Sequence, residues 1–107
     1  MNFISKEIAM SYLMGNEMIF SKIKASFLNS YINHENDFPA LMERKNLKDL
    51  ELYIHSIKGI SLNLGAKVLY DTAVEALVHI RKELYDEKTL NSFFIALKGT
   101  YIELSQL

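Results

Sequence analysis

The chain of 107 residues has no cysteine, no tryptophan, one proline and only four glycines. Without cysteine it has neither a disulfide framework nor a thiolate metal site, and this fits the reducing environment of a cytoplasmic protein. The low proline and glycine content leaves few positions at which a helix would have to break. No segment has the ~20 consecutive apolar residues of a membrane span, so we expect no membrane contact.

An excess of charge of one sign is also missing. Twelve basic and 13 acidic residues are interspersed along the chain and give a net charge of −1, so the sequence offers no basic face for nucleic acid. Half of the residues are hydrophobic, which is enough for a normal core. A chain of this length makes one domain, and we expect a single domain over residues 1–107 that is a monomer.

Apolar residues recur at three- and four-residue spacing along the chain, and no strand-like alternation of any length is present. This pattern indicates an all-α protein. We expect a connection over 33–37 and a short helical piece from Asp37 onward, since proline suits a first turn. Short connections favour an antiparallel four-helix bundle with a short extra N-terminal helix. The short helix should end near Met14, and the four long helices should span about 16–31, 46–65, 66–84 and 86–104.

Caps and buried faces follow from the same periodicity. Asn16, Asn46 and Asp86 each precede a periodic segment and are expected to cap it, and Gly65 is expected to end the third long helix. His34, in the expected connection, is predicted to be solvated, and His79 to lie on the surface. The expected core residues of the last three helices are Leu47, Leu50, Ile54, Ile57, Ser61 and Leu64; Leu69, Ala73, Ala76, Leu77, Ile80 and Leu84; and Leu90, Phe94, Leu97, Tyr101 and Leu104.

One outward stripe of the 46–65 helix carries His55, Lys58 and Gly59 within a single turn. A neutral imidazole is a competent nitrogen nucleophile near neutral pH, and a cation at Lys58 would offset the charge of a phosphoryl group on the ring. Gly59 costs the helix ~1 kcal/mol relative to alanine, which makes sense if a side chain there would block a partner. From these residues alone, a surface histidine paired by chance with a lysine, and a glycine that permits close helix packing, remain equally good explanations.

The stripe continues on both sides of the histidine. Glu51 and Leu52 lie one turn before it, and Leu62 lies two turns after it. Because the core does not need these leucines, we predict that the three residues form a docking surface for another protein. The spacing of the histidines and carboxylates predicts no metal site.

His55, Lys58 and Gly59, followed by Leu64-Gly65-Ala66, resemble the signature of histidine-containing phosphotransfer (HPt) domains of two-component phosphorelays. The resemblance extends more weakly to residues 14–17 with Phe27 and to residues 41–50, and so covers nearly the whole chain. Domains of this family are four-helix bundles, often with an extra N-terminal helix, in agreement with the architecture expected above.

The resemblance implies that His55 accepts a phosphoryl group through Nε2 from the aspartate of a response-regulator receiver domain and passes it to another receiver. The implied partners are receiver domains and a hybrid sensor histidine kinase. Mg²⁺ is expected on the receiver, and this chain is expected to need no cofactor of its own. It has no glycine-rich nucleotide loop, so no ATP-dependent kinase activity is expected.

The sequence departs from the family pattern at one point. Many members carry a Gln or Glu on the next helix that faces the histidine. The corresponding positions here hold Ala76 and Leu77, and Glu75 is expected to point elsewhere. We therefore assign no second polar partner to the imidazole of His55.

Two other functions are compatible with the same residues. The chain could be an HPt-like bundle that docks receivers or kinases without carrying phosphate. It could also be an unrelated helical interaction domain, for example a dimer, in which His55 is incidental. Incubation with a phosphorylated receiver distinguishes them, because only a phosphotransfer protein would become labelled.

Overall fold

The computed structural model describes residues 2–107, and within that range every regular element is helical. This confirms the all-α prediction. Residues 2–107 form six α-helices and one short 3₁₀ helix. Their bounds are α1 Lys6–Tyr12, α2 Glu17–Ser30, α3 His34–Arg44, α4 Leu47–Ser61, η1 Leu62–Leu64, α5 Lys67–Arg81 and α6 Glu87–Ser105.

The helices begin where the predicted capping residues stand. The side chains of Asn16, Asn46 and Asp86 accept hydrogen bonds from the backbone N–H three residues on, at 3.0, 3.2 and 2.9 Å, as predicted. Hydrogen bonds from the backbone and side chain of Thr89 lower the pKa of Asp86 below its ordinary value. Each cap satisfies an N–H that the helix itself leaves without a partner.

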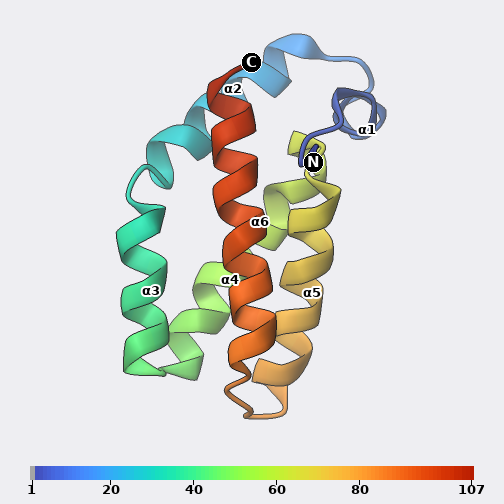
Figure 1. The fold of residues 1–107 in the computed structure, drawn as a ribbon. Helices are drawn as coiled ribbons and strands as arrows, with labels where there is room; N and C mark the ends of the chain where they lie inside the picture. Colours follow the sequence, from blue (N-terminus) through green and yellow to red (C-terminus); the bar gives the residue numbers. More distant parts are fainter. Residues whose placement is uncertain (1) are drawn as a thin grey trace.

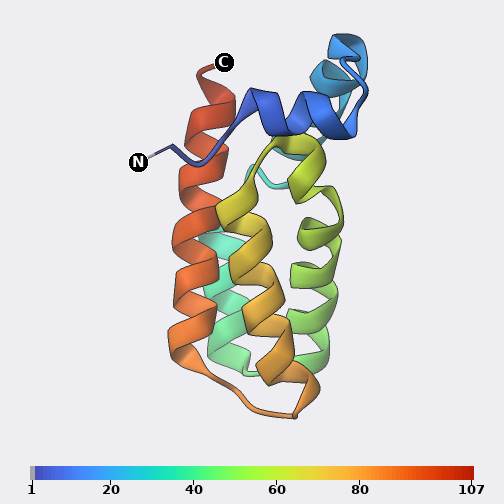
Figure 2. The same cartoon turned by 90° about the vertical axis from the view of Figure 1, so that its right-hand side faces the viewer.

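α3, α4, α5 and α6 pack around the core, each touching two of the others: α3 lies against α4 and α6, and α5 against the same two helices (Figure 1). The chain direction alternates from one of these helices to the next along the sequence. α2 continues the side of α3 upward and contacts α6 and η1, while α1 lies across the end of the molecule over η1 (Figures 1 and 2). The resulting body measures 39 × 24 × 24 Å.

The predicted core faces are largely correct. In α4, Leu50, Ile54, Ile57 and Ser61 are fully buried, and Leu64 of η1 joins them. Leu47, in the first turn, is only partly buried. The Ser61 hydroxyl donates to the Ile57 carbonyl at 2.7 Å, which explains how a polar side chain is accommodated in this core.

The prediction of a connection over 33–37 is wrong, because α3 begins at His34 and runs for eleven residues. His34 is also not solvated: only 3% of its surface is exposed. Its Nδ1 donates to the Tyr31 carbonyl at 2.8 Å, and its ring lies 4.6 Å from that of Tyr101 on α6. Burial against an aromatic ring, which the local sequence does not reveal, anchors the start of this helix.

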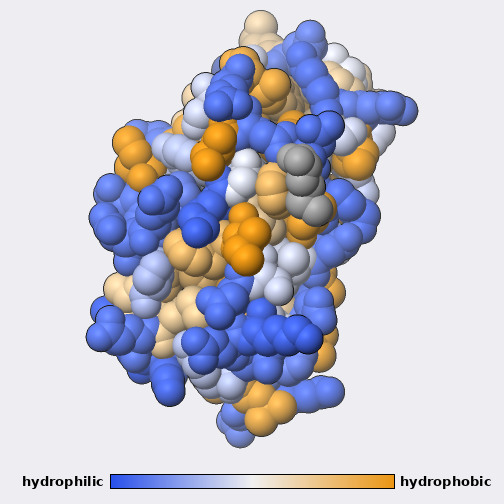
Figure 3. Space-filling model, viewed as in Figure 1, coloured by the Kyte–Doolittle hydropathy of each residue, from blue (hydrophilic) through white to orange (hydrophobic). Residues whose placement is uncertain are grey.

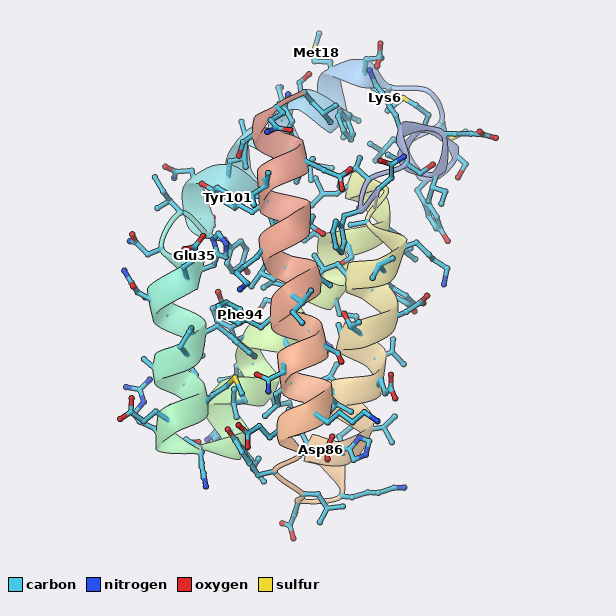
Figure 4. All side chains as sticks on the ribbon, in the orientation of Figure 1. Lys6, Met18, Glu35, Asp86, Phe94 and Tyr101 are labelled. Carbon is cyan, nitrogen blue, oxygen red and sulfur yellow. The ribbon has the colours of Figure 1, made fainter. Side chains whose placement is uncertain are left out.

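α6 supplies a second aromatic contact to α3. The ring of Phe38 stacks on that of Phe94 at 5.6 Å and packs against Phe93 at 5.2 Å. Figure 4 shows Phe94 and Tyr101 both projecting from α6 toward α3. These contacts make α3 a full element of the core rather than the short helical piece that the sequence suggested.

The predicted end of the 66–84 helix is also wrong, because the helix ends three residues earlier. α5 ends at Arg81, and Glu83 has a positive φ of 58° that turns the chain away. Leu84 therefore does not face the core, and 52% of its surface is exposed. The other predicted inward residues of this helix, from Leu69 to Ile80, are buried.

Polar side chains cover much of the face of the molecule that carries α3 and α6. Figure 3 shows hydrophilic side chains over most of one face, with apolar areas that are small and separate. Among residues 2–107, no helix combines the length and the apolar character needed to cross a membrane.

Candidate functional site

His55 lies near the middle of α4 and is exposed, on the opposite side of the helix from the buried Leu50 and Ile57. One turn further along, Lys58 is partly buried and Gly59 is exposed. The structure thus places the three residues on one accessible stripe of a rigid helix. The capped start at Asn46 and the buried face of α4 hold that stripe in position.

Gly59 is the informative member of this stripe. An ideal Cβ built on Gly59 would meet no atom within 4 Å, apart from its chain neighbours and the backbone of its own helix. No neighbouring helix therefore requires a glycine at this position, which removes close packing as its explanation. The open space lies one helical turn from His55.

The predicted docking residues have different surroundings. Leu52 is 61% exposed and free to contact a partner. Glu51 is partly buried, and its carboxylate pairs with Arg81 of α5 at 3.5 Å. Leu62 lies in η1 and is partly buried. The most accessible apolar contact on this stripe is therefore Leu52.

α5 borders the stripe with apolar side chains. Arg81, Val78 and Val74 are spaced by three and four residues and so share one face of α5. The Glu51–Arg81 pair joins this face to α4. Since α4 and α5 pack side by side and run in opposite directions, we expect the two valines to lie on the α5 side of the stripe. Both valines are exposed. Sequence reasoning missed them because it searched α5 only for a polar partner.

Ala76 and Leu77 of α5 are buried and Glu75 is exposed. The side chains at the family's usual polar position therefore belong to the core, as the sequence suggested. Neither of these two positions therefore offers a polar side chain to the imidazole of His55.

On the other side of Gly59, α2 and α4 enclose a groove of 430 Å³. Ser56 and Ile60, each one residue after a member of the stripe, form its α4 wall. Tyr31 is part of the lining, and burial raises the pKa of its hydroxyl above the ordinary value. Lys22 is the one charged residue of the lining, which consists of Lys22, Ile23, Ser26, Phe27, Ser30, Tyr31, Ser56 and Ile60. The sequence could not reveal this groove, because its lining comes from two helices whose relative placement no local pattern reports.

The remaining histidines are separate from this site. His34 lies in the aromatic contact between α3 and α6, and the Nδ1 of His79 is 3.1 Å from the Glu75 carbonyl on its own helix. In the part of the chain that the structure describes, no three histidine or acidic side chains gather as a metal site would require.

Comparison of the chain with protein-family models, with curated proteins and with solved structures finds no match.

Proposed function

We propose that this protein is a phosphotransfer carrier in which His55 receives a phosphoryl group from the aspartate of a receiver domain and passes it to another. The observation that carries this proposal is Gly59, a helix-interior glycine that no intramolecular contact requires, one turn from an exposed histidine. His55, Lys58 and Gly59 together resemble the HPt signature. We therefore interpret the open space at Gly59 as access for the domain that brings the phosphoryl group.

The chemistry assigned to His55 needs only the imidazole and a nearby cation. The Nε2 lone pair attacks phosphorus in line, the bond between phosphorus and the aspartate oxygen breaks, and the carboxylate leaves with the electron pair. The new N–P bond is at Nε2, and the ring proton stays on Nδ1. Lys58 would offset the negative charge that the phosphoryl group brings. The same steps in reverse order transfer the phosphoryl group from His55 to the aspartate of a receiver.

The arrangement of the helices supports this assignment. We interpret α2 and α3 as two segments of the first helix of an antiparallel four-helix bundle, completed by α4, α5 and α6, with α1 as the extra N-terminal helix. In such a bundle the histidine helix is held along its length by neighbours while one stripe stays accessible.

The docking surface would lie on both sides of the histidine. Leu52, Val74 and Val78 supply exposed apolar area, and the α2–α4 groove adds a concave apolar surface with Lys22 at its edge. The acidic pocket of a receiver would be attracted by Lys22 and Lys58. The partners proposed are receiver domains and a hybrid sensor kinase, the receiver supplies Mg²⁺, and the compartment proposed is the cytoplasm.

A docking module that carries no phosphate is the second candidate, favoured by the same exposed apolar residues. Incubation with a receiver phosphorylated on aspartate separates the two functions. Acid-labile, base-stable label that appears on wild type and not on His55→Gln supports the carrier. Binding of the receiver without any label on wild type supports the docking module.

A further inference from the structure

The segment Asn2–Ser5, which we call the strap, passes across α6 before α1 begins (Figure 2). The Glu103 carboxylate near the end of α6 accepts hydrogen bonds from the backbone N–H groups of Phe3 and Ile4, the second at 3.2 Å. The Ser5 N–H donates to the Gly65 carbonyl at 2.8 Å. One side chain and one carbonyl therefore bind three consecutive backbone N–H groups of the strap, those of Phe3, Ile4 and Ser5.

Two glycines lie directly under the strap. A Cβ on Gly99, in the middle of α6, would overlap the ring of Phe3. A Cβ on Gly65 would overlap the carbonyl of Ser5, and Gly65 also has a positive φ of 72°. The contrast with Gly59 is clear, because that glycine faces open space.

α1 continues from the strap as a cover over the end of the bundle. It packs on η1 and on α2. Its Ala9 is fully buried and faces Gly65, and beneath it Leu64 and Ala66 are also buried. This cover closes the core at the end of the helix that carries His55.

We propose that the strap and α1 form a lid over the η1 end of the molecule, closed by two contacts with α6: the Phe3 ring on Gly99, and the Glu103 carboxylate on the strap backbone. The lid opens as a unit when these contacts are lost, because α3 to α6 keep their own core. Opening uncovers Leu64 and Ala66. This inference is independent of phosphotransfer and stands or falls on separate measurements.

Gly99→Ala tests the first contact, with Gly59→Ala as the matched control. Both positions are helix interiors where alanine is the better helix former, but only at Gly99 does the methyl group displace a strap side chain. Amide hydrogen exchange of Ser5 reports directly on the lid, because its N–H bonds to Gly65. We expect exchange to accelerate by about tenfold or more in Gly99→Ala and to stay unchanged in Gly59→Ala.

Glu103→Ala tests the second contact, with the exposed Glu75→Ala as its control. We expect Glu103→Ala to accelerate exchange at Ser5 and in α1, while amides buried in α4 to α6 keep their protection. Unchanged exchange at Ser5 in both Gly99→Ala and Glu103→Ala would overturn the proposal. Equal acceleration throughout α4 to α6 would also overturn it, because the lid would then not be a separate unit.

Discussion

At the scale of single residues, three glycines of this chain differ in what surrounds them. Gly65 combines a positive φ with the close approach of the Ser5 backbone, and Gly99 lies under the Phe3 ring. Gly59 has regular helical geometry and open space around it. The fold therefore explains the first two glycines but not Gly59, for which we propose that the open space gives access to His55.

Gly59→Met tests this explanation. Methionine is a good helix former and meets no neighbour at its Cβ, so we expect the free energy of unfolding to rise by about 1 kcal/mol. Its side chain would also stand beside His55 and slow phosphotransfer from a receiver about 10- to 100-fold. Urea unfolding and a transfer time course measure the two effects. Unchanged transfer in a stabilised variant would contradict the role of Gly59.

At the scale of elements, the sequence predicts the starts of the three capped helices correctly but misses the start of α3. The caps at Asn16, Asn46 and Asp86 were predictable because each depends on a bond to a residue three positions away. The start of α3 depends instead on the contact of His34 with Tyr101, which is 67 residues away, and no local pattern reports it.

The candidate site divides in the same way. The exposure of His55 follows from the periodicity of one helix, so the sequence predicted it. To find Val74 and Val78, the packing of α5 against α4 had to be known, and to find the groove, the placement of α2 relative to α4. The features that depend on contacts between helices could not be predicted, because the sequence shows only the patterns within each helix.

Asp86→Asn tests the cap of α6 through pH. Because hydrogen bonds from Thr89 lower the pKa of Asp86 below 3.8, the charged carboxylate contributes stability above that pH, and the contribution is lost as the pH falls through the lowered pKa. Asparagine caps helices about as well but does not titrate. We expect the urea midpoint of wild type, relative to the variant, to fall on acidification from about pH 6 to pH 2. A difference that stays constant over this range would contradict this account of the cap.

At the scale of the whole molecule, the packing of the helices places two different surfaces beside the accessible stripe of α4. A concave groove lies on one side of the stripe, and exposed apolar residues of α5 lie on the other. α2 supplies Lys22, Ile23 and Phe27 to the groove, and α5 supplies the valines. A partner domain could therefore contact three helices while reaching one histidine. This predicts that affinity and reactivity can be altered separately.

Ser26→Trp tests the groove, with Ser92→Trp on α6 as the matched control. Both serines are exposed, but only Ser26 lines the groove. We expect the tryptophan at position 26 to fill the groove and weaken receiver binding about tenfold or more, a loss of ~1.4 kcal/mol. Phosphorylation of His55 by the small donor phosphoramidate should be unchanged, since the ring stays exposed. Equal receiver affinity in both variants, measured by titration calorimetry, would exclude the groove from the interface.

The central claim is that His55 carries phosphate between proteins. The measurement that tests it most directly is phosphotransfer from a receiver labelled on aspartate, with wild type and His55→Gln compared side by side and circular dichroism showing that both are folded. The account predicts acid-labile, base-stable label on wild type and none on the variant. Label on both proteins, or on neither, would contradict it.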